Sequence, residues 1–487
     1  MNCDIANLEP KCVWKHFAAI CDVPRPSKKE EKMVEFMLAF GKEHGLETHV
    51  DEIGNVLFRK PATPGMENRK GIVLQGHLDM VPQKNNDTVH NFETDPIQPY
   101  IDGDWVKAKG TTLGADNGIG LAAAMAVLVA KDLEHGPIEA LFTTDEETGM
   151  TGAFGLKNTF LKGDILINLD SEDEGEVFIG CAGGVDTNVE FSFKKEPVPA
   201  NHRAFQLTVK GLRGGHSGCD IHLGRGNANK IMNRFLWMGE RECGLRIHHV
   251  DGGSLRNALP RESVSTVVLP ADKVDDFKKR FHEVEKLILN ELSSTEPGLT
   301  CIIEPVALPD YVMDTQTQTR FVGAVYGCPH GVYNMIADMP EIVETSNNLA
   351  MIKFKDTTIS IGTLQRSSVD SAKEDLATMI RSVFELAGAD KIVHEGSYPG
   401  WKPNLKSPVL ATSIEQYKKC FGVEPEVKVI HAGLECGLIG DVYPNMDLIS
   451  FGPTIRNPHS PDEMLNIPTV TKFWDFTVEI LKNAPVK

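Results

Sequence analysis

The stretch Gly71-Ile-Val-Leu-Gln-Gly76-His77-Leu-Asp79-Met-Val81 organises this chain. Its first half is an apolar, β-branched run of the length of a strand, and Gly76 ends that run. Because side chains alternate along an extended chain, His77 and Asp79 point the same way, about 7 Å apart. We interpret His77 as a metal ligand and Asp79 as the carboxylate that orients its ring. The alternative is a surface histidine beside a strand-end turn, and only partners elsewhere in the chain can decide between the two.

Length and composition describe a globular protein with more than one domain. The chain has 487 residues, which exceeds what one hydrophobic core normally supports. Hydrophobic residues make up 41% and charged residues 24%, as in ordinary globular proteins, so the composition excludes a disordered or fibrous chain. The longest apolar runs, such as 121–130, are too short to span a bilayer, and the N-terminus lacks the basic start and apolar core of a signal peptide. We therefore expect a cytoplasmic protein.

Charge and cysteine content exclude several other classes. The formal net charge of −18 argues against nucleic acid and anionic membranes as partners. An acidic protein that binds an anionic substrate needs a local cation, and Arg366 is a candidate for that role. The ten cysteines include no Cys-x-x-Cys pair, so neither a zinc finger nor a redox motif is indicated, and we expect the cysteines to be reduced.

Further carboxylates and a second histidine follow other predicted strands. Glu146 and Glu147 stand at the end of one apolar run, and Asp170 ends the next. His459 lies between two prolines just beyond a third run. The strands that we predict span residues 139–144, 164–169 and 447–451. Because ligands of open α/β sheets bind at the carboxyl ends of the strands, this pattern is the one that a binding site requires.

A glycine-rich loop, residues 110–120, precedes a predicted helix over 121–130. A loop of this kind can cradle a phosphate at the start of a helix. Its spacing, however, fits neither the dinucleotide fingerprint nor the P-loop. The alternative is that its glycines let the backbone pass close to a metal centre, where Asp116 supplies an oxygen.

Five of these side chains form a donor set for metal ions: His77, Asp116, Glu147, Asp170 and His459. Two imidazoles and three carboxylates suit Zn²⁺, and also Mn²⁺ or Co²⁺. Five ligands exceed what one catalytic zinc needs, but they suit two divalent ions if one carboxylate bridges them. Two such ions activate a shared water and polarise a carbonyl. Glu146 adjoins a ligand without being needed as one, so it is the candidate general acid and base.

The pattern of predicted strands and helices changes twice along the chain. We predict that an α/β catalytic domain, with a mixed, mostly parallel sheet flanked by helices, comprises residues 1–185 and 399–487. Residues 186–398 combine short alternating strands with amphipathic helices, which predicts an inserted α+β domain. We find no internal repeat.

Three local expectations accompany this division. Residues 11–46 predict a helix with Leu38 and Phe40 in its apolar pattern. Residues 82–105 form a polar, proline-rich excursion. Residues 272–292 predict a charged helix with four apolar side chains on one face. Those four residues are Phe277, Phe281, Val284 and Leu287.

Seven motifs, taken together and in this order, resemble those of a known family. They are Gln75-Gly-His77-Leu-Asp79-Met-Val-Pro-Gln-Lys84, Gly114-Ala-Asp116-Asn-Gly-Ile-Gly120, Asp145-Glu146-Glu147-Thr-Gly149, Ile167-Asn-Leu-Asp170-Ser, Gly214-Gly-His216-Ser-Gly218, His431-Ala-Gly-Leu-Glu-Cys-Gly437 and Pro458-His459-Ser-Pro-Asp-Glu463. The chain resembles the co-catalytic zinc peptidases related to carboxypeptidase G, aminoacylases and carnosinases. Within that family it is most similar to the bacterial aminoacyl-histidine dipeptidases, essentially from end to end.

The resemblance implies a division of the ligands between two metals. One metal would bind His77 and Asp170, the other would bind Glu147 and His459, and Asp116 would bridge them. It likewise implies that Asp79 orients the first histidine and that Glu146 is the base.

The resemblance also makes the inserted domain a lid that binds the substrate. It implies that His216 stabilises the oxyanion, that Asn257 and Arg366 hold the carbonyl or the terminal carboxylate of the substrate, and that Gly433 offers a backbone donor. An arginine fork suits a carboxylate geometrically.

Taken alone, each of these side chains has a simpler explanation. His216 and Asn257 could be turn residues, and Arg366 could pair with Asp370 four positions later.

We therefore expect a two-metal exopeptidase that hydrolyses unblocked dipeptides, with Xaa-His and β-Ala-His included by family likeness. In this mechanism the metals would activate water for attack and a glutamate would act as the base. An N-acyl amino acid deacylase or a tripeptidase would use the same metals on another scissile group, and a catalytically dead binding protein would have lost a ligand or the base. The resemblance also favours a homodimer formed through the lid domain. In such a dimer the partner subunit can contribute the lid histidine to the active site.

Overall fold

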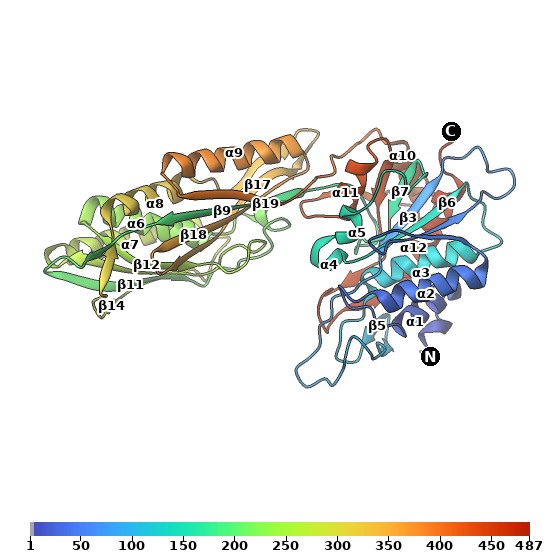
Figure 1. Ribbon diagram of the computed structural model, residues 1–487, viewed down its shortest axis with the longest axis horizontal. Coiled ribbons are helices and arrows are strands. Elements are labelled where there is room, and N and C mark those ends of the chain that lie inside the picture. Colours follow the sequence, from blue (N-terminus) through green and yellow to red (C-terminus); the bar gives the residue numbers. More distant parts are fainter. Residues whose placement is uncertain (1–3) are drawn as a thin grey trace. The chain divides into compact units, whose positions relative to one another are not determined.

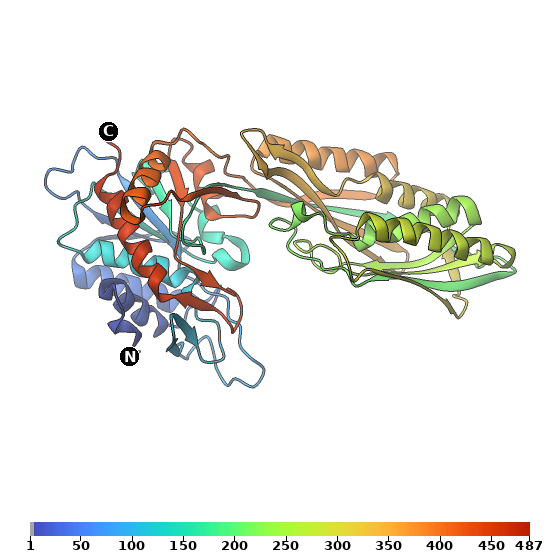
Figure 2. The same ribbon diagram turned by 180° about the vertical axis from the view of Figure 1, so that it is seen from behind.

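The computed structural model describes residues 4–487, which form two compact units (Figure 1). Unit 1 comprises the chain up to Gly180, Trp401–Val429 and Leu434–Lys487. Unit 2 comprises Cys181–Gly400 and, in addition, the four residues Ile430–Gly433. Both ends of the chain belong to unit 1 (Figure 2). The domain boundaries predicted from the sequence lie after residues 185 and 398. The sequence does not indicate that residues 430–433 return to unit 2.

Unit 1 contains an eight-stranded sheet, a small four-stranded sheet and the helices that surround them. Its elements are η1 (Ile5–Asn7), α1 (Lys11–Cys21), α2 (Glu31–His44), β1 (Glu47–Val50), β2 (Val56–Lys60), β3 (Ile72–His77), β4 (Pro99–Asp102), β5 (Trp105–Ala108), α3 (Ala115–Val129), β6 (Ile138–Thr143), α4 (Glu146–Gly149), α5 (Thr151–Phe154), β7 (Ile165–Asn168), β8 (Glu176–Cys181), α10 (Pro408–Phe421), β20 (Glu426–Ile430), α11 (Glu435–Val442), β21 (Asp447–Ser450), β22 (Ile455–Arg456), β23 (Met464–Asn466) and α12 (Ile467–Lys482).

The large sheet is mixed, in the order β1-β2-β6-β3-β7-β21-β8-β20. The four central strands β6, β3, β7 and β21 pair parallel, whereas β1 with β2, β2 with β6 and β8 with β21 pair antiparallel. The prediction of a mixed sheet is confirmed, but the sheet is less parallel than the sequence suggested. Every residue of β3 is buried, because β3 has a parallel neighbour on each side.

Helices cover the large sheet. In Figure 1 helices α1, α2 and α3 face the viewer, and in Figure 2, from behind, the red helix α12 does. The single helix predicted over residues 11–46 is wrong: α1 ends at Cys21 and α2 begins at Glu31. Two prolines, Pro24 and Pro26, interrupt the helical hydrogen bonds between them. Phe40 is buried as expected, but Leu38 is 42% exposed.

The excursion over residues 82–105 contains regular structure. It supplies β4 and the start of β5, and β5 pairs with β23 in a small sheet of order β22-β23-β5-β4. Strands β22 and β23 flank the loop 457–463, which carries His459. The excursion thus anchors the loop that holds one of the predicted ligands.

Unit 2 contains a nine-stranded antiparallel sheet and four long helices. Its elements are β9 (Gly183–Ser192), β10 (Lys195–Pro197), β11 (His202–Lys210), η2 (Ile221–Leu223), α6 (Ala228–Cys243), β12 (Arg246–Gly252), β13 (Ser263–Pro270), η3 (Ala271–Lys273), α7 (Val274–Glu291), β14 (Thr300–Val306), β15 (Tyr311–Met313), α8 (Thr315–Gly327), β16 (Gly331–Ile336), β17 (Met339–Lys355), β18 (Thr358–Ser367), α9 (Asp370–Leu386) and β19 (Lys391–Tyr398).

One topology occurs twice in unit 2. Strands β11, β12, β13 and β14 with helices α6 and α7 follow the order β-α-β-β-α-β and lie side by side as β14-β11-β13-β12. Strands β9, β17, β18 and β19 with α8 and α9 repeat this order and lie as β19-β9-β18-β17. The two modules join through antiparallel pairing of β12 with β17. The sequence indicates no internal repeat, so the repeat is one of topology alone.

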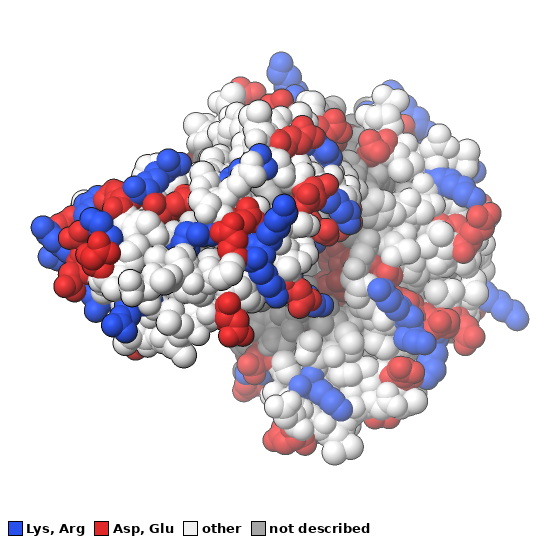
Figure 3. All heavy atoms as spheres, turned by 60° about the vertical axis from the view of Figure 1, so that its left-hand side comes forward, with Lys and Arg blue, Asp and Glu red and all other residues white. Residues whose placement is uncertain are grey.

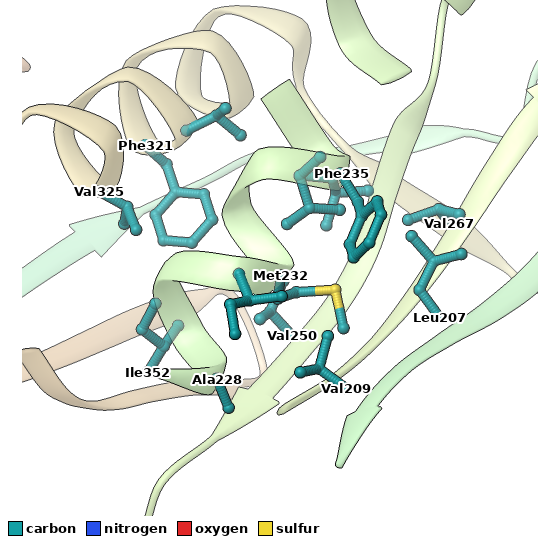
Figure 4. Packing of buried hydrophobic residues seen from close by; sticks show 14 of the residues in the cluster. Leu207, Val209, Ala228, Met232, Phe235, Val250, Val267, Phe321, Val325 and Ile352 are labelled. Carbon is teal, nitrogen blue, oxygen red and sulfur yellow. The ribbon is translucent and has the colours of Figure 1, made fainter. Parts of the chain in front are cut away.

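The helices of unit 2 pack on the sheet around one hydrophobic core. Figure 4 shows Met232 and Phe235 of α6 lying against Leu207 and Val267 of the sheet. The buried face of α7 includes Phe277, Phe281 and Ile288, whereas the predicted Leu287 is 57% exposed. The last residue of the buried face is therefore Ile288, one position beyond the predicted Leu287.

The surface carries charges of both signs. On the face shown in Figure 3, Lys and Arg side chains lie interspersed with Asp and Glu side chains. None of the helices within residues 4–487 combines the length and the apolar character that a membrane crossing requires.

Candidate metal centre

The site begins where β3 ends. The His77 ring is buried, and its Nδ1 lies 3.3 Å from Oδ1 of Asp79 and 3.2 Å from the Asp79 carbonyl oxygen. The Asp79 carboxylate also accepts hydrogen bonds from the backbone N–H groups of Glu146 and Glu147, at the start of α4. Asp79 therefore lies beside the His77 ring, as the sequence predicts, and leaves Nε2 directed away from it.

Two carboxylates face the free nitrogen of this ring. His77 Nε2 lies 3.0 Å from Oδ1 of Asp116 and 3.4 Å from Oδ1 of Asp170. One ligand atom of each residue lies within 4.8 Å of the others. Parallel pairing of β3 with β7 brings the end of β7, and with it Asp170, next to His77.

A second trio shares Asp116 with the first. His459 Nε2 lies 3.1 Å from Oδ2 of Asp116 and 2.9 Å from Oε2 of Glu147. Asp116 therefore turns one oxygen toward each histidine, which is the geometry of a bridging carboxylate. The structure brings all five of the predicted ligands together in two groups of three.

The donor set fits divalent cations. Oε1 of Glu147 is buried without a hydrogen-bond partner in the part of the chain that the structure describes. Burial and the Asp116 carboxylate raise the pKa of Asp170 to about 7, and hydrogen bonding of the His459 ring to the Asp116 and Glu147 carboxylates, which accept, raises the pKa of His459 to about 11. Without metal, bound protons therefore offset the negative charge of the crowded carboxylates, and divalent ions can replace those protons.

Glu146 lies beside both trios without belonging to either. It groups instead with His77 and Glu147, and among the described residues its carboxylate has no hydrogen-bond partner. Burial raises the pKa of Glu146 well above its ordinary value, an effect that His77 opposes and that the Asp170 carboxylate reinforces. This is the setting that a carboxylate exchanging protons with a substrate needs.

Glu463 holds the glycine-rich loop. Its two carboxylate oxygens accept hydrogen bonds from four successive backbone N–H groups, at 2.7–3.2 Å, from residues 113–116. The loop's anion-binding donors are thus satisfied by a carboxylate of the chain itself, and the phosphate interpretation is wrong. Glu463 stands in the last of the seven motifs, but the sequence does not indicate this role for it.

Arg25 is a second residue that sequence reasoning missed. Its buried guanidinium donates to the carbonyl oxygens of Leu78, Asp79 and Gly114, and so ties the end of β3 to the glycine-rich loop. Nothing in the sequence distinguishes an arginine between two prolines from a surface residue.

The glycines make room for a side chain. A Cβ on Gly76 would stand 2.1 Å from Oδ1 of Asn117 and a Cβ on Gly120 would stand 2.6 Å from the same atom. Asn117 Nδ2 donates to the Leu169 carbonyl oxygen at 2.7 Å, which links the residue after Asp116 to the residue before Asp170.

In unit 2, His216 has a defined tautomer. Its Nδ1 accepts hydrogen bonds from the backbone N–H groups of Gly218 and Cys219, so in the neutral ring the proton is on Nε2. Burial and the neighbouring Arg366 lower the pKa of His216 to about 4. His216 is therefore a neutral donor at neutral pH.

Two other predicted residues of unit 2, Asn257 and Arg366, contact Ser217, the residue after this histidine. The exposed Asn257 accepts the backbone N–H of Ser217 at its carbonyl oxygen, so the two loops are joined. Arg366 is 5% exposed, and its Nε lies 3.4 Å from Oγ of Ser217. A pairing of Arg366 with Asp370 does not form, because Lys373 takes that carboxylate.

Comparison with known proteins gives a consistent result. Residues 73–483 match the profile of Peptidase family M20/M25/M40. The Cytosol non-specific dipeptidase of Escherichia coli (strain K12) is 48% identical over 484 residues, which are 99% of this chain and 100% of that protein.

Solved structures agree with the sequence comparison. The aminoacylhistidine dipeptidase of Vibrio alginolyticus is 51% identical, with a TM-score of 0.95 over 99% of each chain. Aminopeptidase PepT of Bacillus cereus is 16% identical with a TM-score of 0.57, covering 98% of this chain and 99% of that one, and shares the fold. The resemblance deduced from the seven motifs is confirmed.

Glu463→Gln tests whether the anchored loop positions the bridging carboxylate. The amide keeps the size of the side chain but directs N–H donors at backbone N–H donors, so we expect metal affinity to fall by about 10–100-fold. Calorimetric titration of the metal-free protein measures this fall, with the exposed Glu67→Gln as the control. Equal affinities in the two variants would contradict the positioning role.

The protonation of His216 can be followed by NMR. Because its pKa is lowered, the ring stays neutral from pH 8 downward and gains a proton only near pH 4. We expect the Nε2–H tautomer over that range, in a ¹⁵N signal that His216→Gln removes. Titration near the ordinary value of about 6.5, or a proton on Nδ1, would show that the described geometry is wrong.

Proposed function

The chain belongs to peptidase family M20/M25/M40, and from that membership we propose that it is a two-metal dipeptidase. The proposed substrates are unblocked dipeptides, with Xaa-His and β-Ala-His among them. One observation carries the proposal: two trios share Asp116, whose two oxygens face His77 and His459. Both similar dipeptidases named above match the chain over nearly its whole length.

We assign the five ligands as the resemblance implies. His77 and Asp170 would hold one ion, Glu147 and His459 the other, and Asp116 both. Zn²⁺ fits this set of nitrogen and oxygen donors, and so do Mn²⁺ and Co²⁺. When bound, two such ions would activate water and polarise the scissile carbonyl.

The remaining residues of the centre would handle protons and orientation. The Glu146 carboxylate would take a proton from the attacking water and pass it to the leaving amine. Asp79 would keep the His77 ring in the tautomer whose Nε2 is free, which its position beside Nδ1 supports.

Residues of unit 2 would bind the substrate. His216 would donate Nε2–H to the oxyanion, which its tautomer supports. Arg366 would bind the terminal carboxylate, because its guanidinium is buried and forms no ion pair within residues 4–487. A buried charge without a counter-ion is costly, so an anionic ligand fits there. Asn257 and the N–H of Gly433 would hold the carbonyl.

Three further points belong to the proposal. An N-acyl amino acid deacylase or a tripeptidase would use the same metal centre, and the substrate comparison below separates them from a dipeptidase.

The name of the Escherichia coli relative places that protein in the cytosol, and we propose the same location. We also propose a homodimer through unit 2, supported by the family resemblance, which analytical ultracentrifugation tests.

Glu146→Gln should leave metal binding intact and stop turnover. The amide cannot accept the water proton, so we expect kcat to fall by roughly 10²–10⁴-fold. Histidine release from Ala-His measures kcat, and metal content per chain is measured on the same sample. A variant with near-normal kcat would remove Glu146 from this role.

Arg366→Ala should affect substrates according to their carboxyl end. Loss of charge-assisted hydrogen bonds should raise KM for Ala-His by roughly 100-fold and leave Ala-His amide nearly unchanged. Equal effects on the two substrates would exclude carboxylate binding by Arg366. In the wild-type protein, faster cleavage of N-acetyl-histidine or of a tripeptide than of Ala-His would favour the deacylase or the tripeptidase.

A further inference from the structure

We infer that Tyr398 joins Arg366 in binding the terminal carboxylate of the substrate, to which its hydroxyl donates a hydrogen bond. This inference deepens the proposed function and rests on it. Arg366 Nη1 donates to the Tyr398 hydroxyl oxygen at 2.9 Å. The hydroxyl's own proton then has no acceptor among residues 4–487 and is available to an anionic ligand.

The register of the sheet explains why these two side chains meet. Arg366 on β18 and Tyr398 on β19 both lie directly opposite Gly184 on β9. Directly opposite residues share a face of the sheet, so Arg366 and Tyr398 point to the same side with one strand between them. Only a residue without a side chain at position 184 lets the tyrosine ring lie across that strand.

Distances around the ring support this explanation. A Cβ on Gly184 would stand 2.7 Å from Cε1 of Tyr398, and a Cβ on Gly433 would stand 3.2 Å from Cε2 of the same ring. Two glycines therefore hold the ring, one on each side, and fix where its hydroxyl points.

Neighbouring contacts lie on either side of Arg366 and Tyr398. Ser346 lies opposite Arg366 on β17, and its hydroxyl is 2.7 Å from Nε2 of the buried His431. The Tyr398 carbonyl oxygen accepts a hydrogen bond from Lys373, whose Nζ also binds Asp370. Lys373 and Asp370 thus hold the backbone of the tyrosine, while its hydroxyl remains bound to Arg366.

The donors of Arg366 and Tyr398 suit a carboxylate. A guanidinium supplies charge and planar N–H donors, and a tyrosine hydroxyl that already accepts from that guanidinium is polarised as a donor. The described part of unit 2 places no acid in an ion pair with Arg366, so the two donors have no anion of the chain itself to bind. We assign Tyr398 to substrates with a free carboxyl end and not to neutral ones.

Tyr398→Phe tests the inference with Ala-His and Ala-His amide as probes. The ring still fits between the two glycines, but one hydrogen bond to a charged group is lost, so we expect KM for Ala-His to rise about 10-fold. We expect kcat for Ala-His, and both constants for the amide, to change less than about 2-fold. Gly184→Ala, which displaces the ring, should give the same pattern. Tyr443→Phe in unit 1, which removes the hydroxyl that binds Phe160 and Leu161, should leave the ratio of the two substrates unchanged.

Arg366→Ala, measured with the same pair of substrates, separates a failure of the Tyr398 inference from a failure of the proposed function. If Arg366→Ala distinguishes the substrates and Tyr398→Phe does not, the inference about Tyr398 is overturned and the proposed function stands. If Arg366→Ala does not distinguish them either, the proposed role of Arg366 fails first. In the Arg366→Ala background Tyr398→Phe should add less than about 2-fold, and a full independent 10-fold effect there would contradict a shared anion site.

Discussion

The two oxygens of one carboxylate, Asp116, impose the main constraint on this structure. Each oxygen must face a different histidine, so the backbone that carries Asp116 has to be held on every side. The Glu463 carboxylate accepts four successive N–H groups of the glycine-rich loop, Arg25 binds a carbonyl oxygen of the same loop, and Asn117 donates to the carbonyl oxygen of Leu169, the residue before Asp170. The glycines leave room for these contacts, which is why a loop that resembles a phosphate cradle holds a carboxylate of the chain itself.

The sheet of unit 1 supplies the remaining geometry. Parallel pairing in its centre brings the ends of β3, β6 and β7 to one edge, and with them a histidine, two glutamates and an aspartate. Unit 2 applies a different principle: an antiparallel register sets Arg366 and Tyr398 on one face across a glycine. In both units, residues far apart in the sequence become neighbours through strand pairing.

Much of the centre could be predicted because its residues stand at strand ends, where an apolar run gives way to a histidine or a carboxylate. The five predicted ligands do come together in two trios, and the family is confirmed. Glu463 and Arg25 could not be found in this way, because their partners are backbone groups of distant loops and leave no mark on spacing. Tyr398 escaped for a similar reason, since its significance depends on a register shared with Gly184 and Arg366. The parallel content of the sheet, the break between α1 and α2 and the repeated topology of unit 2 likewise depend on pairing and packing beyond a local pattern.

The central claim is that one centre binds two metal ions and hydrolyses dipeptides. The most direct test removes metal by chelation and adds Zn²⁺ back stepwise while histidine release from Ala-His and bound metal are measured together, with Mn²⁺ and Co²⁺ in parallel. If the claim is right, activity rises to a plateau near two ions per chain. A plateau at one ion, or a protein that binds two ions and cleaves no dipeptide, would contradict it.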